Sequence, residues 1–148
     1  MPPFDSAALP PELARFLALW ERRRGTGRDM PARRDFSLED LWPWMGYLHL
    51  VELQQDGADG RYRVFATAST ERFRQEMTGR LISQYQPTDL AVRALEDHAA
   101  IVAAKAPLSR TLHDVLGGTM MHWTRLALPL GDNGRDMDRY FVALHYWL

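Results

Sequence analysis

The sequence predicts an α+β fold built on an antiparallel sheet, and three observations lead to this fold class. A length of 148 residues suits one domain with one sizeable core. Strand-like runs form two groups, at 47–67 and 108–147, and helical patterns lie before and between them. Short turns rich in glycine and aspartate join the runs within each group. Such turns favour antiparallel pairing over the long crossovers of a parallel sheet.

The first predicted element is an amphipathic helix over 10–25. Residues 1–9 are expected to be a flexible N-terminus, and the domain is expected to span 10–148. Proline is tolerated in the first helical turn, and Gly25 is a natural stop. An apolar stripe at helical spacing consists of Leu13, Phe16, Leu17 and Trp20. Two interpretations stay open: the stripe packs on its own domain, or it forms the interface of a homodimer.

The first hairpin is predicted after a short helix. That helix begins with Ser37 as N-cap and Asp40 as its capping partner. The run 47–53 has apolar residues of both parities, which indicates a strand covered on both faces. Two Asp-Gly dipeptides then provide a turn, and the run 61–67 alternates charged and apolar residues like a half-buried strand.

The longest helix is predicted over 88–104, with Thr88 as its N-cap, after a shorter helical pattern at 69–76. The apolar face expected to be buried consists of Val92, Leu95, Ala99 and Val102. The charged residues expected to point away from that face are Arg93, Glu96 and Asp97.

Three strands are expected to end the chain. Two of them, 108–116 and 119–130, are joined by a Gly-Gly dipeptide, and the last covers 140–147.

Composition and charge exclude several classes of function. The net charge of −1 offers no basic surface for nucleic acid, and the absence of cysteine excludes disulfides and thiol nucleophiles. The N-terminus lacks the basic and apolar regions of a signal peptide. No apolar run approaches the ~20 residues that span a bilayer. We therefore expect a cytoplasmic protein with neither nucleic acid nor membrane as partner.

Several short motifs occur in a specific order over about 13–147. They are Leu19-Trp20, Met30-Pro31-Ala32-Arg33-Arg34-Asp35-Phe36, Tyr47-Leu48-His49-Leu50, Tyr62-Arg63, Thr78-Gly79-Arg80 and Leu128-Pro129-Leu130. Together they resemble the short single-domain PAS proteins common in alphaproteobacteria, a family long described as of unknown function. The resemblance implies a PAS-like five-stranded antiparallel sheet with helices on one face, here with an extra N-terminal amphipathic helix. Ala66 and Arg74 stand where that family often has glycine.

Histidines are the most prominent candidates for chemistry. If the Gly-Gly dipeptide is a two-residue hairpin loop, His113 faces His122 across the two strands. Leu126, Leu128 and Leu130 share the parity of His122, so the pair is expected on the core side, at the end of a pocket. Two such imidazoles could share a metal, an anion or a proton, or form a solvated polar pair. The candidate ligand pocket consists of His98, His113, His122, Tyr62 and Thr124.

His98 carries the alternative hypothesis of a haem sensor. It lies beside the expected apolar face of the longest helix. In haem-binding PAS domains, which the fold resembles, a histidine on the corresponding helix is the iron ligand. A lone histidine there is also typical of ordinary packing, and no haem attachment motif accompanies it. We expect a colourless protein without haem.

These inferences lead to a sensory or signalling domain that acts in trans. It is expected to bind a small ligand or a partner protein and to pass the signal by altered dimer or partner contacts. No catalytic triad, phosphate loop or metalloprotease motif is present, so no enzyme activity, cofactor or metal is expected. The alternatives are a haem- or other cofactor-binding sensor and a small enzyme on a cone-shaped α+β fold.

Overall fold

A five-stranded antiparallel sheet forms the centre of the molecule, in the order β2-β1-β5-β4-β3. The computed structural model describes residues 8–116 and 118–147. The strands are β1 (Leu48–Gln54), β2 (Asp59–Val64), β3 (Leu108–Leu116), β4 (Thr119–Leu130) and β5 (Arg139–Tyr146). The helices are α1 (Pro11–Arg24), α2 (Leu38–Leu41), α3 (Thr67–Phe73) and α4 (Thr88–Ala104). The predicted fold class is confirmed.

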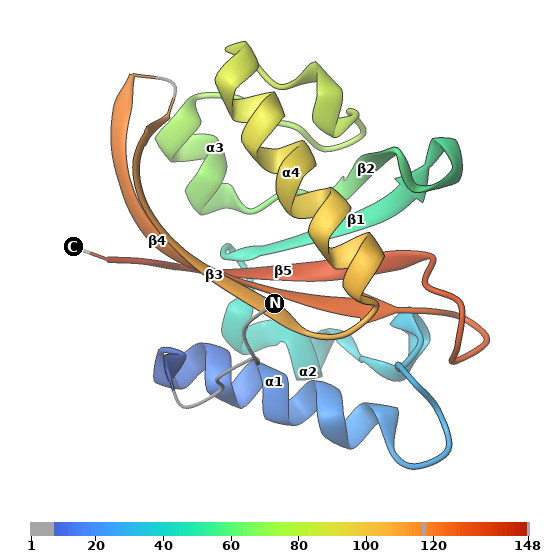
Figure 1. Cartoon of the computed structure of the whole chain (residues 1–148). Helices are drawn as coiled ribbons and strands as arrows, with labels where there is room; N and C mark the ends of the chain where they lie inside the picture. The colour runs from blue at the N-terminus through green and yellow to red at the C-terminus, as the bar shows by residue number, and fades with distance from the viewer. Residues whose placement is uncertain (1–7, 117, 148) are drawn as a thin grey trace.

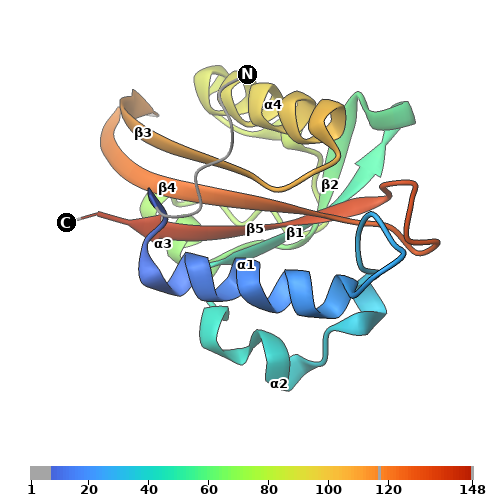
Figure 2. The same cartoon turned by 60° about the horizontal axis from the view of Figure 1, so that its bottom comes forward.

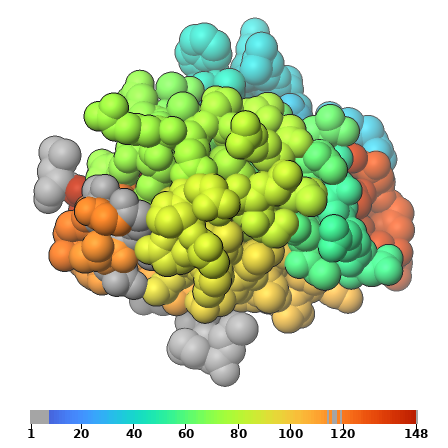
Figure 3. Space-filling view, turned by 90° about the horizontal axis from the view of Figure 1, so that it is seen from above, coloured from blue at the N-terminus to red at the C-terminus, as the bar shows by residue number. Residues whose placement is uncertain are grey.

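Helices cover both faces of this sheet. Figure 1 shows α3 and α4 above the sheet and α1 and α2 below it. After the turn that brings the lower side forward, α1 lies along the direction of β5, and α2 lies beside α1 (Figure 2). Seen from above, α4 and the segment 67–87 cover the middle of the other face (Figure 3). The expected extra N-terminal helix therefore has a sheet face of its own.

The α1 face is an apolar core, and it corrects the expected dimer interface. The predicted stripe, Leu13, Phe16, Leu17 and Trp20, is buried within the chain itself. Phe16 stacks on Trp44 with ring centroids 4.5 Å apart, and the indole of Trp20 donates to the carbonyl of Pro129 at 2.9 Å. Because the sheet turns the side chains of Leu126 and Leu128 towards α1, the stripe has an intramolecular partner. It is not available to a second copy.

The α4 face corrects the predicted orientation of the longest helix. The helix has the predicted bounds, but its buried residues are Leu90, Ala91, His98 and Ile101. Val92, which was expected inside, is 50% exposed. Apolar residues surround most of the first two turns, so periodicity alone did not select the buried side. The N-cap is Pro87 rather than Thr88, so the N-cap side chain makes no hydrogen bond to the helix.

The β3–β4 hairpin has the predicted strand bounds and register. Leu116 pairs with Thr119, and His113 faces His122. Gly117 of the predicted loop lies outside the described residues. Figure 1 shows the hairpin curving out of the sheet towards the layer of α3 and α4. The two strands therefore form a wall beside that layer as well as an edge of the sheet.

Local predictions elsewhere have mixed outcomes. The hydroxyl of Ser37 accepts a hydrogen bond from the backbone amide of Asp40 at 3.0 Å, as the capping pattern predicted. Arg74 ends α3 in the left-handed conformation (φ 57°) that favours glycine, at one of the two departures from the family pattern. Residues 1–7 of the expected flexible N-terminus lie outside the described residues, whereas Leu9 is buried against the core. No helix within the described ranges is both long and apolar enough to cross a membrane.

Candidate functional site

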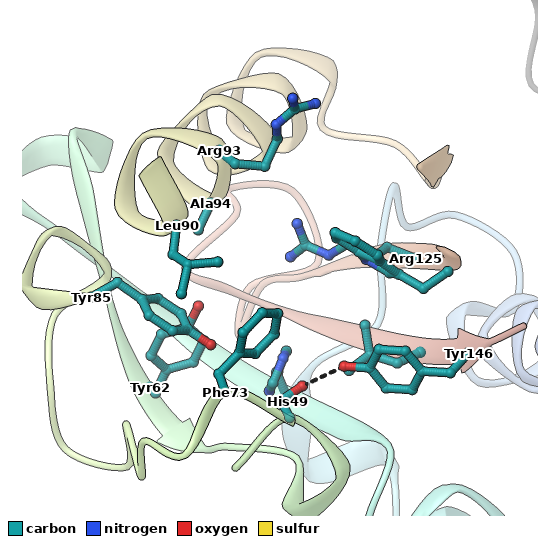
Figure 4. A pocket seen from close by; sticks show the side chains of 12 residues that line it. His49, Tyr62, Phe73, Tyr85, Leu90, Arg93, Ala94, Arg125 and Tyr146 are labelled. Atoms are coloured by element: carbon teal, nitrogen blue, oxygen red, sulfur yellow. Dashed lines mark hydrogen bonds between the residues drawn. The ribbon is translucent and has the colours of Figure 1, made fainter. Parts of the chain in front are cut away.

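A cavity lies between the sheet and the layer of α3 and α4 (Figure 4). Its volume is about 50 Å³. That is room for a few waters, whereas pockets for drug-sized ligands reach ~300–1,000 Å³. The sheet contributes His49 from β1, Tyr62 from β2 and Arg125 from β4. Tyr85 closes the side next to α4, and its hydroxyl and that of Tyr62 point into the space between helix and sheet.

His49 is held as a neutral hydrogen-bond donor in this cavity. Its Nδ1 accepts the amide of Ala66 at 2.9 Å, so the proton resides on Nε2. Burial, together with the positive charge of Arg125, lowers the pKa of His49 to about 3. Desolvation disfavours a charged imidazole here because the ring has little water around it. At neutral pH the ring therefore offers an N–H and no positive charge.

Two tyrosine hydroxyls are also held in their donor form. Burial raises the pKa of Tyr62 to about 12 and raises the pKa of Tyr85 as well. Neither hydroxyl has a hydrogen-bond partner among the residues that the structure describes. The hydroxyl of Tyr146 differs, because it bonds to Ser69 at 2.8 Å. Hydrogen-bond donors on His49, Tyr62 and Tyr85 therefore line the cavity, and the two tyrosine hydroxyls are free to bond to a ligand.

Arg125 forms the charged wall of the cavity and belongs to an ionic cluster with Asp97 and Arg110. Asp97 comes from α4 and pairs with both guanidinium groups, at 2.5 Å in the case of Arg110. The side chains of Asp97 and Arg125 are each 15% exposed. Burial is the largest single influence and would by itself lower the pKa of Arg125, but the attraction of Asp97 and of neighbouring tyrosines together outweighs it, and the pKa is raised. Arg125 is therefore charged, and α4 is tied to β4 by a largely buried ion pair.

A larger groove lies on the other side of Arg125, between α4 and strands β3, β4 and β5. Its volume is about 400 Å³, within the ~300–1,000 Å³ typical of small-molecule sites. Apolar side chains on its walls are Ala100, Leu108, Ala127 and Val142. The ionic cluster lines it at one place, and Arg125 lines both the groove and the cavity. By size the groove, rather than the cavity, suits the body of a small organic molecule.

The structure brings only Tyr62 of the expected pocket residues into the cavity. His98 is buried on α4 but lines neither the cavity nor the groove. Its Nδ1 lies 2.7 Å from the hydroxyl of Tyr140, and its Nε2 lies 3.0 Å from the carbonyl of Gly57. Since the carbonyl can only accept, Nε2 carries the proton and Nδ1 accepts from Tyr140. Both ring nitrogens are committed, so His98 holds α4 in place and presents no lone pair to an iron.

His113, His122 and Thr124 lie on the opposite face of the sheet, which corrects their expected place in the pocket. The predicted register is present, and the imidazole centroids are 3.7 Å apart. Desolvation, and then the proximity of His113, lowers the pKa of His122. However, Thr124 bonds to Thr111 and Trp147 instead of lining the cavity. The prediction failed because the leucines of β4 that share this parity face α1, not α4.

The cavity residue that sequence reasoning missed most clearly is Arg125. Its signal was an arginine that directly precedes the apolar run 126–130. A charge there, with the parity of Met121, Trp123 and Ala127, indicates a buried polar site on that sheet face. Asp97 was missed because α4 was expected to turn it outwards. Among the described residues, no group of three or more histidine or acidic side chains is placed to hold a metal.

Comparisons with known proteins support the fold. No protein-family model matches the chain, and no curated protein matches it in sequence. The PAS domain of BvgS from Bordetella pertussis is similar over 68% of this chain and 76% of its own, with 16% identity and a TM-score of 0.54. A domain of an HTR-like protein from Haloarcula marismortui has 16% identity over 68% of this chain and 98% of its own, with a TM-score of 0.47.

A sensory box sensor histidine kinase from Vibrio cholerae has 12% identity over 75% of this chain and 87% of its own, also with a TM-score of 0.47. The two TM-scores of 0.47 are too low to support a conclusion about this chain. The likeness to the BvgS domain shows that the chain has a PAS-like fold. Kinship with the alphaproteobacterial family stays a resemblance in sequence motifs.

Proposed function

We propose that this chain is a PAS-like sensory domain that binds a small organic ligand between α4 and the sheet. The observation that carries the proposal is the position of Arg125. Its charged group is largely buried between a cavity with uncommitted donors and a groove of ligand size. A buried charge of this kind is costly to a fold, and such groups are concentrated at functional sites. The PAS-like fold agrees with a sensory role.

Signal transfer follows from the way the site is tied to α4. Asp97 belongs to α4 and pairs with Arg125 on β4. A ligand that contacts Arg125 changes the energy of this link and so favours one position of the helix over another. A ligand can shift such an equilibrium only by its difference in affinity for the two states. The changed surface then acts on a second copy or on a partner protein, without catalysis.

The test is whether ligand binding depends on the groove. A small-molecule library is screened by thermal shift, and native mass spectrometry of freshly purified protein searches for a molecule that co-purifies. The blocking variant is Ala100→Trp, because Ala100 is exposed on α4 and lines the groove. Ala99→Trp is the matched control, since Ala99 is exposed on the same helix but does not line it.

We expect Ala100→Trp to abolish binding and Ala99→Trp to retain it, with unchanged circular dichroism in both. Binding that survives Ala100→Trp, or a screen without any hit, contradicts the proposal. Sedimentation velocity with and without the hit then tests the transfer step. The expected result is a ligand-dependent change in self-association or in binding to a partner.

A further inference from the structure

The ionic cluster carries one positive charge that is not balanced within it. Arg110 and Arg125 lie directly opposite each other on β3 and β4. Like charges at directly opposed positions of a sheet repel each other. Asp97 reaches between them from α4, and among the described residues it is the only carboxylate that pairs with either arginine. Two guanidinium groups and one carboxylate leave room for one more anion.

The surroundings of the cluster restrict what that anion is attached to. The groove that the arginines line has an apolar floor and walls formed by Leu108, Ala127 and Val142. A free inorganic anion would leave this surface in contact with water. An apolar molecule without a charge would leave the guanidinium groups without a second partner. A molecule with a carboxylate at one end and an apolar body at the other satisfies both parts.

We propose that the ligand of this site is an amphipathic organic acid, such as a medium-chain fatty acid or an arylalkanoic acid. Its carboxylate accepts hydrogen bonds from Arg110 and Arg125, and its apolar body lies along Leu108, Ala127 and Val142. A planar carboxylate matches the fork of donors on a guanidinium, and such charge-assisted bonds are the stronger kind. This inference rests on the proposed function, because it names the ligand of the same groove.

Asp97 then acts as an internal competitor for the ligand. Its carboxylate occupies donors that the carboxylate of the ligand also uses. When the acid binds, the arginines divide their donors between two carboxylates, and the hold of β4 on α4 weakens. Arrival of the acid is thus converted into a change in the contact between helix and sheet. The effect requires a charged head group, which makes it separable from simple filling of the groove.

Isothermal titration of the full chain with four probes tests the ligand class. The probes are octanoate, octan-1-ol, octylamine and inorganic phosphate. We expect octanoate to bind at least tenfold more tightly than the other three. Shortening octanoate to hexanoate should weaken binding, because each methylene buried contributes roughly fourfold in affinity. Equal affinities for octanoate and octan-1-ol would contradict recognition of a charged head group. Equal affinities for octanoate and phosphate would contradict recognition of an apolar body.

Three variants test the role of the cluster. Arg110→Gln should weaken octanoate binding roughly tenfold, and because Arg110 is 43% exposed the fold should tolerate it. Arg63→Gln is the control, since this arginine pairs with Glu52 on the surface of β2, away from the groove. Asp97→Asn should tighten octanoate binding severalfold and leave octanol unchanged. A loss of octanoate binding in Asp97→Asn overturns the idea of competition.

The outcomes separate this inference from the proposed function. A hit of another chemical class that Ala100→Trp blocks would leave the proposed function in place and refute the organic acid. A screen in which neither acids nor any other class binds would refute both. If octanoate affinity is unchanged in Ala100→Trp but reduced in Arg110→Gln, the acid binds outside the groove. That result also overturns the inference.

Discussion

The two faces of the sheet are built on opposite principles. The face under α1 is an apolar core in which Phe16, Trp20 and the leucines of β4 interlock, and the indole N–H of Trp20 is satisfied by a backbone carbonyl. The face under α4 buries charged and titratable side chains among its apolar ones, including His49, His98 and Arg125, and it carries the cavity and the groove.

The difference shows how one strand serves stability and recognition together. Along β4 the even positions from 126 to 130 are leucines that face α1, whereas position 125 is the arginine that faces α4. Successive side chains of a strand point to opposite faces. The α1 face therefore supplies the burial that offsets the cost of a charge on the other face. Substitutions on the two faces should therefore differ in how they change the free energy of unfolding and its dependence on pH.

The largest loss of stability is expected from a cavity on the α1 face. Phe16→Ala removes a fully buried ring that stacks on Trp44, and such changes cost about 3–5 kcal/mol in the free energy of unfolding. Urea denaturation measures the change. Trp42→Ala is the control, because Trp42 is 70% exposed, and it should change stability by less than ~0.5 kcal/mol. Equal losses in both variants would show that α1 is not the core helix.

On the α4 face, breaking the buried ion pair should be costly and removing it whole should not. Arg125→Met leaves Asp97 with only the more exposed Arg110 as partner, and we expect a loss of about 3 kcal/mol. Replacing both partners, in Arg125→Met/Asp97→Leu, should restore most of that loss, because similar volumes are kept without a charge. Denaturation of Arg125→Met, Asp97→Leu and the double variant, compared with the wild type, forms a double-mutant cycle. Additive losses would contradict a coupled pair.

A pH dependence of stability should distinguish the faces next. The pKa of His49 is about 3 in the folded chain, against 6.5 for an ordinary histidine, so between these pH values the unfolded state binds the extra proton. Stability therefore falls as pH drops through this window, by about 1.4 kcal/mol per pH unit for one such group. His98, whose pKa burial also lowers, adds to the slope.

The variant for this test is His49→Asn, which keeps an acceptor near the amide of Ala66. Its free energy of unfolding, measured by urea at several pH values from 7.5 to 4.5, should lose the contribution of one proton to the slope. A slope equal to that of the wild type would mean that His49 is charged or solvated in the folded chain.

The smallest effect on stability is expected where a donor has no partner. Tyr85→Phe removes a hydroxyl without a hydrogen-bond partner among the described residues, so stability should change by less than ~0.5 kcal/mol. Tyr140→Phe is the matched comparison. It removes the hydroxyl that bonds to His98 at 2.7 Å, and it should cost about 1–3 kcal/mol. Thermal unfolding of the two variants checks the difference, and a reversed order would contradict the hydrogen-bond assignments.

The apolar stripe of α1 and the strand register could be predicted from the sequence, whereas the sheet face on which the stripe packs and the site could not. Strand bounds at 108–116 and 119–130 and the pairing of His113 with His122 followed from local turn chemistry. The choice of which sheet face meets which helix is a long-range property. Leu126 fits under either helix equally well by hydrophobicity, and nothing local decides between them. Once that choice was wrong, the histidine pair was placed on the pocket side and Arg125 was overlooked.

The order of the strands also has a consequence for how the chain is made. The central strand, β5, is the last of the five sheet strands to be synthesised, and it lies between β1 and β4. Before residue 139 is translated, β1–β2 and β3–β4 are two separate hairpins with no strand in common. Each then exposes an edge to which another chain can add. The nascent chain is thus most open to wrong pairing just before its final strand joins the two halves.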